Sequence, residues 1–151
     1  MKKVNLYTDG ACSGNPGNGG YGTILEFMGI KKELSGGYKN TTNNRMELMA
    51  VIKGLEALKE PCVVTVTSDS KYVVDAFNKG WLNNWIEKNW VKSDRKPVLN
   101  VDLWKQLHIL TEKHEVTFNW IEGHNGHTEN ERCDALAVAA SKSNNLTDDN
   151  Y

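Results

Sequence analysis

Four acidic residues stand where a folded chain can bring carboxylates together. Asp9 and Asp69 end two strand-like segments, and Glu47 and Asp134 lie in the first turns of two helical segments. Carboxylates gathered without cations repel one another and their pKa values rise, so such a group makes sense chiefly around hard divalent cations, which prefer oxygen ligands. The four acids therefore predict a metal site. Mg²⁺ is the ion that we expect there, with Mn²⁺ as a substitute.

A histidine adds proton-transfer chemistry to this set. His124 lies in a glycine-flanked loop just before the last helical segment, and an imidazole titrates near neutral pH. Taken by itself, it is more simply an exposed loop residue. A non-catalytic zinc module is an alternative, with ligands of the usual types at His124, His127, Cys133 and Asp134. That alternative leaves the other three acids without a role.

The pattern of apolar residues indicates which elements carry the acids. Three antiparallel strands in a meander are predicted at 4–8, 21–27 and 31–38, with a glycine-rich loop at 10–20 between the first two. From residue 42 the period becomes helical, with Thr42 or Asn43 as N-cap and Pro61 beyond the end. Residues 63–68 form a short apolar strand that ends just before Asp69.

The second half of the chain alternates helices with one more strand. The predicted elements are a helix at 72–77, a helix that Asn100 caps, a strand at 116–120, and a helix from the capping box 128–131 through 140. This order predicts an α/β fold with a five-stranded mixed sheet. Three antiparallel strands are followed by parallel additions through right-handed crossovers, with helices on both faces.

Two segments differ in composition from the rest of an expected single domain at residues 1–143. Residues 80–97 hold three tryptophans among basic residues and are expected to protrude as a handle. Trp85 and Trp90 are expected to pack on each other and on a neighbouring helix rather than on a ligand. The polar residues 144–151 are expected to form a loose tail.

Length, composition and charge indicate the number of domains and the cellular compartment, but they do not indicate the function. The 151 residues fit one domain, and a formal net charge of −1 does not indicate a polyanionic partner. Three cysteines at irregular spacing argue for a reducing compartment, so a cytoplasmic location is expected. No apolar run approaches the roughly 20 residues that cross a bilayer. We expect a monomer without a membrane segment.

Several short motifs together are similar to those of a known family. They are Tyr7–Cys12, Gly14–Gly17, Thr41–Leu48, Ser68–Ser70, Gly123–His127 and Asn130–Asp134. Each motif alone is a weak signal, but their joint occurrence in this order is specific. The chain resembles bacterial type 1 ribonuclease H over nearly its whole length, to about Ala140.

The resemblance implies an endonuclease that hydrolyses the RNA strand of RNA/DNA hybrids. Asp9, Glu47, Asp69 and Asp134 would then be the catalytic ligands of two Mg²⁺ ions. One ion would activate the attacking water and the other would stabilise the departing 3′ oxygen, which leaves 5′-phosphate and 3′-hydroxyl ends. His124 is similar to the family's mobile histidine, which moves protons or assists product release.

The resemblance also implies substrate contacts. The positions that the family uses for the RNA strand, where the 2′-hydroxyl is read, are Gly10, Cys12, Asn15, Asn43 and Asn44. Thr42 and Asn100 match a pocket for a phosphate of the DNA strand, and Trp81 a support for its sugars. Asn43 and Asn100 can equally be helix caps, and Cys12 a small buried residue.

Two departures from the family pattern concern charge. Lys71 stands where an uncharged amide is common, so it either contacts a phosphate or base edge or is merely solvated. The handle is less basic than in the better-known relatives, which suggests a weaker electrostatic grip on the hybrid. A DNA-cutting nuclease of the same fold, such as a resolvase, and a hybrid-binding protein without activity are the remaining alternatives. The elements Asn43–Asn44 and Gly10–Cys12 argue against the first, and the four acids argue against the second.

Overall fold

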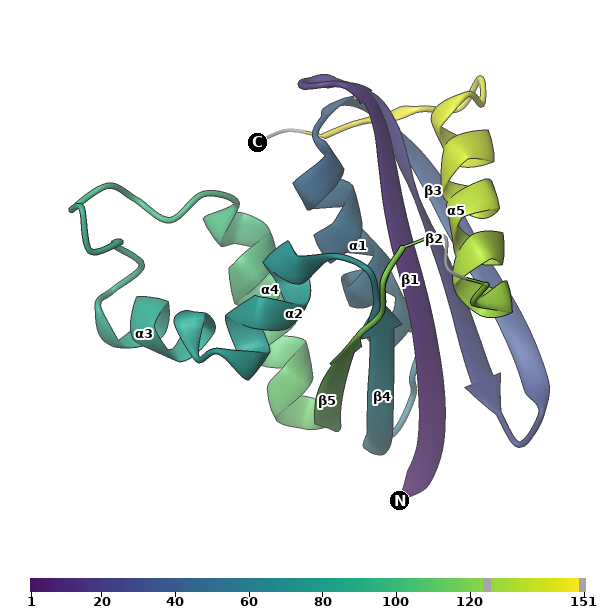
Figure 1. Cartoon of the computed structure of the whole chain (residues 1–151), viewed down its shortest axis with the longest axis horizontal. Helices are drawn as coiled ribbons and strands as arrows, with labels where there is room; N and C mark the ends of the chain where they lie inside the picture. The colour runs from purple at the N-terminus through teal and green to yellow at the C-terminus, as the bar shows by residue number, and fades with distance from the viewer. Residues whose placement is uncertain (124–125, 150–151) are drawn as a thin grey trace.

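The computed structural model describes residues 1–123 and 126–149 of the chain and shows a mixed sheet covered by helices on both faces (Figure 1). The strands are β1 (Lys2–Gly14), β2 (Gly17–Phe27), β3 (Ile30–Thr41), β4 (Cys62–Ser68), β5 (Glu115–Trp120) and β6 (Thr147–Asp148). They lie in the order β5-β4-β1-β2-β3-β6. β1 to β3 form the predicted antiparallel meander, and β4 and β5 add in parallel beside β1. The predicted fold class is confirmed.

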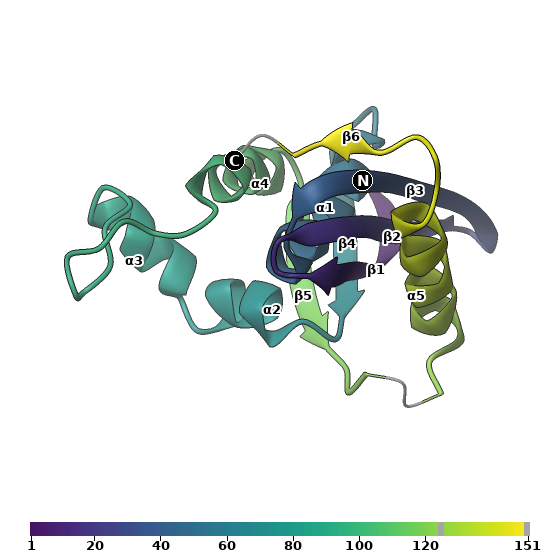
Figure 2. The ribbon, with the colours of Figure 1, turned by 90° about the horizontal axis from the view of Figure 1, so that it is seen from above.

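Five helices complete the described part of the chain: α1 (Asn43–Glu56), α2 (Lys71–Asn78), α3 (Trp81–Glu87), α4 (Val101–Lys113) and α5 (Thr128–Ser141). α5 covers one face of the sheet, and α1, which packs on α4, covers the other (Figures 1 and 2). Leu6, Val64 and Val66 of the sheet are fully buried, as are Leu48 of α1 and Trp104 of α4. No described helix is long and apolar enough to cross a membrane.

The predicted loop at 10–20 is mostly strand, which corrects the sequence-based expectation. β1 and β2 continue as a paired ladder to the turn at Asn15–Pro16. Gly20, within this segment, serves close packing rather than a loop. A Cβ on Gly20 would lie 2.4 Å from the carbonyl oxygen of Ala137, so the backbone of α5 rests directly on β2 at this point.

The N-cap residues agree with the sequence-based expectation at α1 and α4 and differ at α5. Thr42 is the N-cap of α1, and its hydroxyl accepts a hydrogen bond from the Arg45 amide. Asn100 precedes α4 but makes no side-chain capping bond; its backbone has a left-handed conformation with φ of 59°. Thr128 lies inside α5, whose N-cap is His127, also without a side-chain bond. Asn100 is therefore the N-cap of α4 by position, as predicted, but without a side-chain bond. The predicted capping box at 128–131 was wrong.

The end of the chain also differs from expectation. Thr147 and Asp148 pair with Tyr38 and Lys39 of β3, which adds a sixth strand to the predicted five. Asp149 is only 8% exposed. Residues 147–149 are thus docked on the domain, although their polar composition suggested a loose tail.

The handle at residues 80–97 extends away from the sheet (Figure 2). The ring of Trp85 meets Trp104 edge-on, with centroids 5.3 Å apart. Trp90 lies under Lys105, whose Nζ is 5.8 Å from the ring centroid. Both tryptophans therefore pack against α4, as expected for aromatic residues that anchor a protruding segment to its neighbouring helix.

Candidate active site

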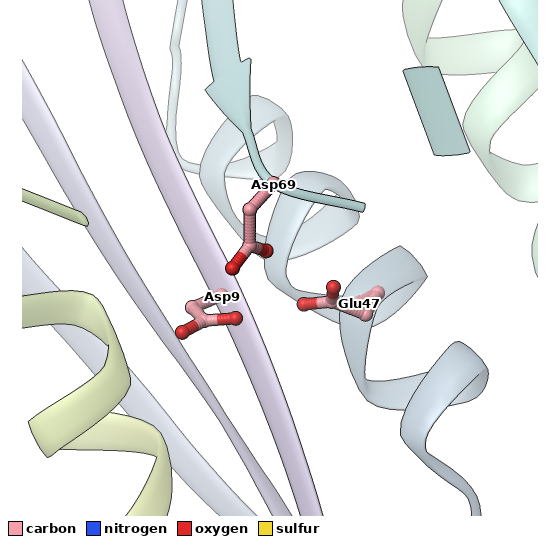
Figure 3. Close-up of side chains that lie close together, drawn as sticks. All are labelled: Asp9, Glu47 and Asp69. Carbon is pink, nitrogen blue, oxygen red and sulfur yellow. The ribbon is translucent and has the colours of Figure 1, made fainter. Parts of the chain in front are cut away.

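Three of the four predicted acids meet where β1, β4 and α1 come together (Figure 3). Asp9 lies in β1, Asp69 directly follows β4, and Glu47 lies in the first turns of α1. β1 and β4 are parallel and in register through Tyr7 and Thr67, so Asp9, within β1, lies beside the end of β4 that Asp69 follows. One carboxylate oxygen from each acid lies within 4.8 Å of the other two.

Gly10 allows α1 to approach β1 closely enough for this arrangement. A Cβ at Gly10 would lie 2.5 Å from the backbone nitrogen of Glu47. Any larger residue would push the first turn of α1 away from the strand and separate Glu47 from Asp9. The Gly10 amide also donates a 2.9 Å hydrogen bond to Oδ1 of Asp9, which orients that carboxylate.

Burial and like charge make the cluster unfavourable without a cation. Asp9 is 8% exposed and Glu47 is 6% exposed. Burial raises the pKa of Asp9 to about 7, and the neighbouring Asp69 carboxylate adds to the effect. Burial, followed by the charges of Asp9 and Asp69, raises the pKa of Glu47 well above its usual value. Oε1 of Glu47 is buried without a hydrogen-bond partner among the described residues. An unpaired buried oxygen beside two further carboxylates fits a hard divalent cation.

The cluster forms the wall of a cavity of about 540 Å³. Asp134, in the second turn of α5, lines this cavity but is not one of the three acids whose oxygens lie within 4.8 Å of one another. The predicted substrate residues that line it are Gly10, Cys12, Asn43, Asn44 and Lys71. The cavity thus combines acids with small polar groups that can contact a sugar or a phosphate.

A second cavity of about 440 Å³ adjoins the first, because Asn43 and Asn44 line both. Its other predicted residues are Asn15, Thr42 and Asn100. Trp81 lies at the start of α3, exposed, and is not among the residues that line either cavity. His124 lies outside the described residues.

Two residues near the cluster were not predicted from the sequence. The Trp120 indole N–H donates to the carbonyl oxygen of Asp69 at 3.1 Å, and Lys71 Nζ lies 4.7 Å from the centroid of the Trp120 ring. The Asn130 amide donates to the carbonyls of Thr8 and Thr67, 3.3 and 3.0 Å away, and so ties α5 to β1 and β4. Trp120 is the last residue of β5, and Asp69 directly follows the neighbouring strand β4. Alternating hydrophobicity does not reveal that these two strand ends lie side by side.

The described residues do not favour the zinc alternative. Cys133 is buried, and its thiol donates a hydrogen bond to the Tyr7 carbonyl. Burial also raises the pKa of this thiol, whereas a zinc ligand must be a thiolate.

Comparison with known proteins agrees with this geometry. The family model described as RNase H matches residues 1–142. The Ribonuclease H of Lachnoclostridium phytofermentans is 60% identical over 154 residues, covering 98% of each chain, and that of Desulforamulus reducens is 57% identical over 146 residues, covering 97% of this chain and 92% of the relative.

Solved structures of RNase H proteins are similar to this chain as well. LC9-RNase H1, a type 1 RNase H with the type 2 active-site motif, superposes with a TM-score of 0.84 at 30% identity, covering 93% of this chain and 72% of that one. LC11-RNase H1 in complex with an RNA/DNA hybrid gives 0.67 at 25% identity, covering 91% and 95%. The chain therefore belongs to the RNase H family.

Proposed function

We propose that the protein is a Mg²⁺-dependent endonuclease that hydrolyses the RNA strand of RNA/DNA hybrids and leaves 5′-phosphate and 3′-hydroxyl ends. The observation that carries the proposal is the buried cluster of Asp9, Glu47 and Asp69 beside a cavity lined by small polar groups. LC11-RNase H1, whose structure is in complex with an RNA/DNA hybrid, supports the substrate class.

The acids would hold two Mg²⁺ ions, with Asp134 completing the set from α5. Bound Mg²⁺ supplies Lewis-acid activation of water and stabilises the charge that develops on the leaving oxygen. The chain's own contribution is rigid placement. Gly10 fixes Asp9 and brings Glu47 close, while Trp120 fixes the backbone at Asp69. Mn²⁺, another divalent ion that accepts oxygen ligands, is expected to support activity as well.

Hybrid selectivity is assigned to the two cavities. Gly10, Cys12, Asn43 and Asn44 would contact the RNA strand, since small polar groups can approach a 2′-hydroxyl in the shallow minor groove. Asn15 would contact the same strand from the second cavity, where Thr42 and Asn100 would hold a DNA phosphate. Trp81 would support the DNA sugars and His124 would move protons or assist product release.

The setting of the enzyme is part of the proposal. Three free cysteines, Cys12, Cys62 and Cys133, support a reducing, cytoplasmic location. We further propose that the protein acts as a monomer of one domain, because both cavities are lined by residues of a single chain.

The test offers four end-labelled substrates of one sequence: an RNA/DNA hybrid, duplex RNA, duplex DNA and single-stranded RNA. Each is incubated with Mg²⁺, Mn²⁺ or EDTA, beside an Asp69→Asn variant. Cleavage confined to the RNA strand of the hybrid, and lost with EDTA and in the variant, supports the proposal. Cleavage of duplex DNA would point to a resolvase-like enzyme. Hybrid binding without cleavage would make the protein a binding module.

A further inference from the structure

Arg45 is a fully buried cation that ties the end of the chain to the second cavity. Its side chain is 1% exposed. The guanidinium donates to both carboxylate oxygens of Asp149, at 2.7 and 3.0 Å, and to both of Asp102, at 2.9 and 2.8 Å. Burial alone would lower the pKa of Arg45, but the hydrogen bonds to Asp102 and Asp149 outweigh it and raise the pKa. A buried charge is tolerated only with such complete pairing.

The same guanidinium also reaches a predicted substrate residue. Nη1 of Arg45 donates to Oδ1 of Asn100 at 3.3 Å. The Asn100 amide nitrogen in turn donates to the Tyr72 hydroxyl at 3.0 Å, which also accepts from Nε1 of Trp104 at 2.9 Å. Asn100 lines the second cavity and Tyr72 lines the first. One hydrogen-bonded chain therefore runs from Asp149 to both cavities.

Asn100 depends on this chain for its orientation because α4 does not use it as a side-chain cap. With its oxygen facing Arg45 and one N–H facing Tyr72, the amide keeps a second N–H for another acceptor.

The tail holds Asp149 in place through contacts of its own. The Asp149 backbone amide donates to the Lys39 carbonyl at 3.1 Å, and the Thr41 hydroxyl donates to Oδ2 at 2.7 Å. β6 pairs with β3 immediately before it. Asp102, the other partner of Arg45, has a side chain that is 47% exposed. Asp149 is consequently the buried anchor of the guanidinium, and Asp102 is the solvated one.

We propose that Asp149 is a positioning residue for hybrid binding: through Arg45 it fixes the Asn100 amide at the wall of the second cavity. This inference rests on the proposed function. Without the Asp149 carboxylate, Arg45 loses its buried anionic partner, so the guanidinium that donates to the Asn100 amide is less firmly fixed. The acids of the metal cluster are not part of this chain of contacts, so substrate affinity falls while the chemical step is spared.

The first experiment compares Asp149→Asn with wild type in steady-state cleavage of the hybrid. The expected result is a KM raised about tenfold, the effect of losing one well-oriented charge-assisted contact, with kcat changed by less than about twofold. Asp148→Asn is the matched control, because the carboxylate of that exposed neighbour accepts a 3.4 Å hydrogen bond from the Asn40 amide and does not contact Arg45. The KM of this variant should not change. Asp149→Glu keeps the charge and should recover part of the affinity.

Two further measurements separate positioning from stability. Val4→Ala removes buried methyl groups from β1, and it should lower Tm without changing KM. In a double-mutant cycle, Asn100→Ala should raise KM by a much smaller factor in the Asp149→Asn background than in wild type. Independent, multiplying effects, or a lowered Tm with unchanged KM, would show that the tail is only structural.

The proposed function and the role of Asp149 are tested by different measurements. If the wild type does not cleave hybrids, the proposed function is wrong. The role of Asp149 is still tested by comparing the affinities of wild type and Asp149→Asn for a labelled hybrid. Equal affinities would overturn it.

Discussion

Asp9 carries a buried carboxyl whose proton is held more tightly in the folded protein than in the unfolded chain. Its raised pKa, about 7, means that the metal-free protein loses stability as pH rises from about 4 through 7, because the unfolded chain has already released that proton. Asp9→Asn should therefore stabilise the metal-free protein at pH 8 by about 2–4 kcal/mol, given about 1.4 kcal/mol per pKa unit.

Urea unfolding in EDTA at pH 8 and at pH 4 measures this difference, which should vanish at the lower pH. Saturating Mg²⁺ should reverse the order of stability, because only the wild type keeps the full set of acids. An Asn variant that is less stable at pH 8 without metal would contradict the assigned cause.

The Trp120 side chain makes two contacts beside the cluster, one with Lys71 and one with the backbone of Asp69. The ring of Trp120 supports the Lys71 ammonium, and its indole N–H holds the carbonyl of Asp69. Lys71→Gln should raise KM for the hybrid about threefold to tenfold and reduce the salt dependence of binding by about one phosphate contact.

Trp120→Phe is the informative partner of Lys71→Gln. It keeps a ring beneath Lys71 but removes the donor to Asp69, so kcat should fall with little change in KM. Steady-state kinetics at several salt concentrations measure both variants. A lowered kcat in Lys71→Gln with an unchanged salt slope would place Lys71 in the chemistry instead of in phosphate binding.

Residue types were easier to predict than residue partners. Asp9, Glu47 and Asp69 were identified because they stand near the ends of predicted elements and in matching motifs, and the structure brings them together. Asp9 lies within β1 rather than at its end. Arg45 and Asp149 were missed as a pair because 104 positions separate them. Trp120 was missed for a similar reason: its partner, the Asp69 carbonyl, is a backbone atom, and backbone atoms leave no signature in side-chain composition.

At the scale of elements, the position of α5 depends on the absence of a side chain at Gly22. A Cβ there would lie 2.1 Å from the backbone oxygen of Cys133, so Gly22→Ala must push α5 from the sheet. Overpacking of this kind costs about 1–3 kcal/mol. Asp134 follows Cys133, and the affinity for Mg²⁺ should therefore fall together with stability.

Gly29→Ala is the control for Gly22→Ala, because a Cβ at Gly29 meets no atom within 4 Å. It should cost only the strain of a positive φ, about 1 kcal/mol, without changing the Mg²⁺ affinity. Urea unfolding and calorimetric Mg²⁺ titration distinguish the two variants. Equal metal affinity in both would separate the position of α5 from the metal site.

The order and type of most elements could be predicted because periodicity reports burial, and burial differs between helix and strand. The glycine-rich segment at 10–20 was misassigned because glycine marks both turns and close backbone packing, and only the partner helix distinguishes them. β6 was missed because two polar residues carry no periodic signal. Its place depends on the buried Arg45–Asp149 pair, a tertiary contact.

For the whole molecule, charge is close to balanced, and this sets how strongly it can bind a polyanion. Residues 80–97 contribute four basic and two acidic side chains, and the protein as a whole carries −1. Log Kd changes with log salt by about 0.9 for each phosphate neutralised on a duplex. We therefore expect a shallow slope, of about 2–4, for hybrid binding by the wild type.

Reversing the two acids of the handle, Glu87→Lys with Asp94→Lys, tests whether the handle meets the hybrid. If the handle contacts phosphates, the slope should steepen by about 1–2 and the affinity at low salt should rise about tenfold or more, because each new contact releases counterions. Lysines placed instead at Glu56 and Glu60, remote from the cavities, keep the total charge of the variant the same. Fluorescence anisotropy of a labelled hybrid in EDTA measures both variants. Equal gains would mean that only net charge matters, whereas a gain confined to the handle variant would identify residues 80–97 as the part of the molecule that grips the hybrid.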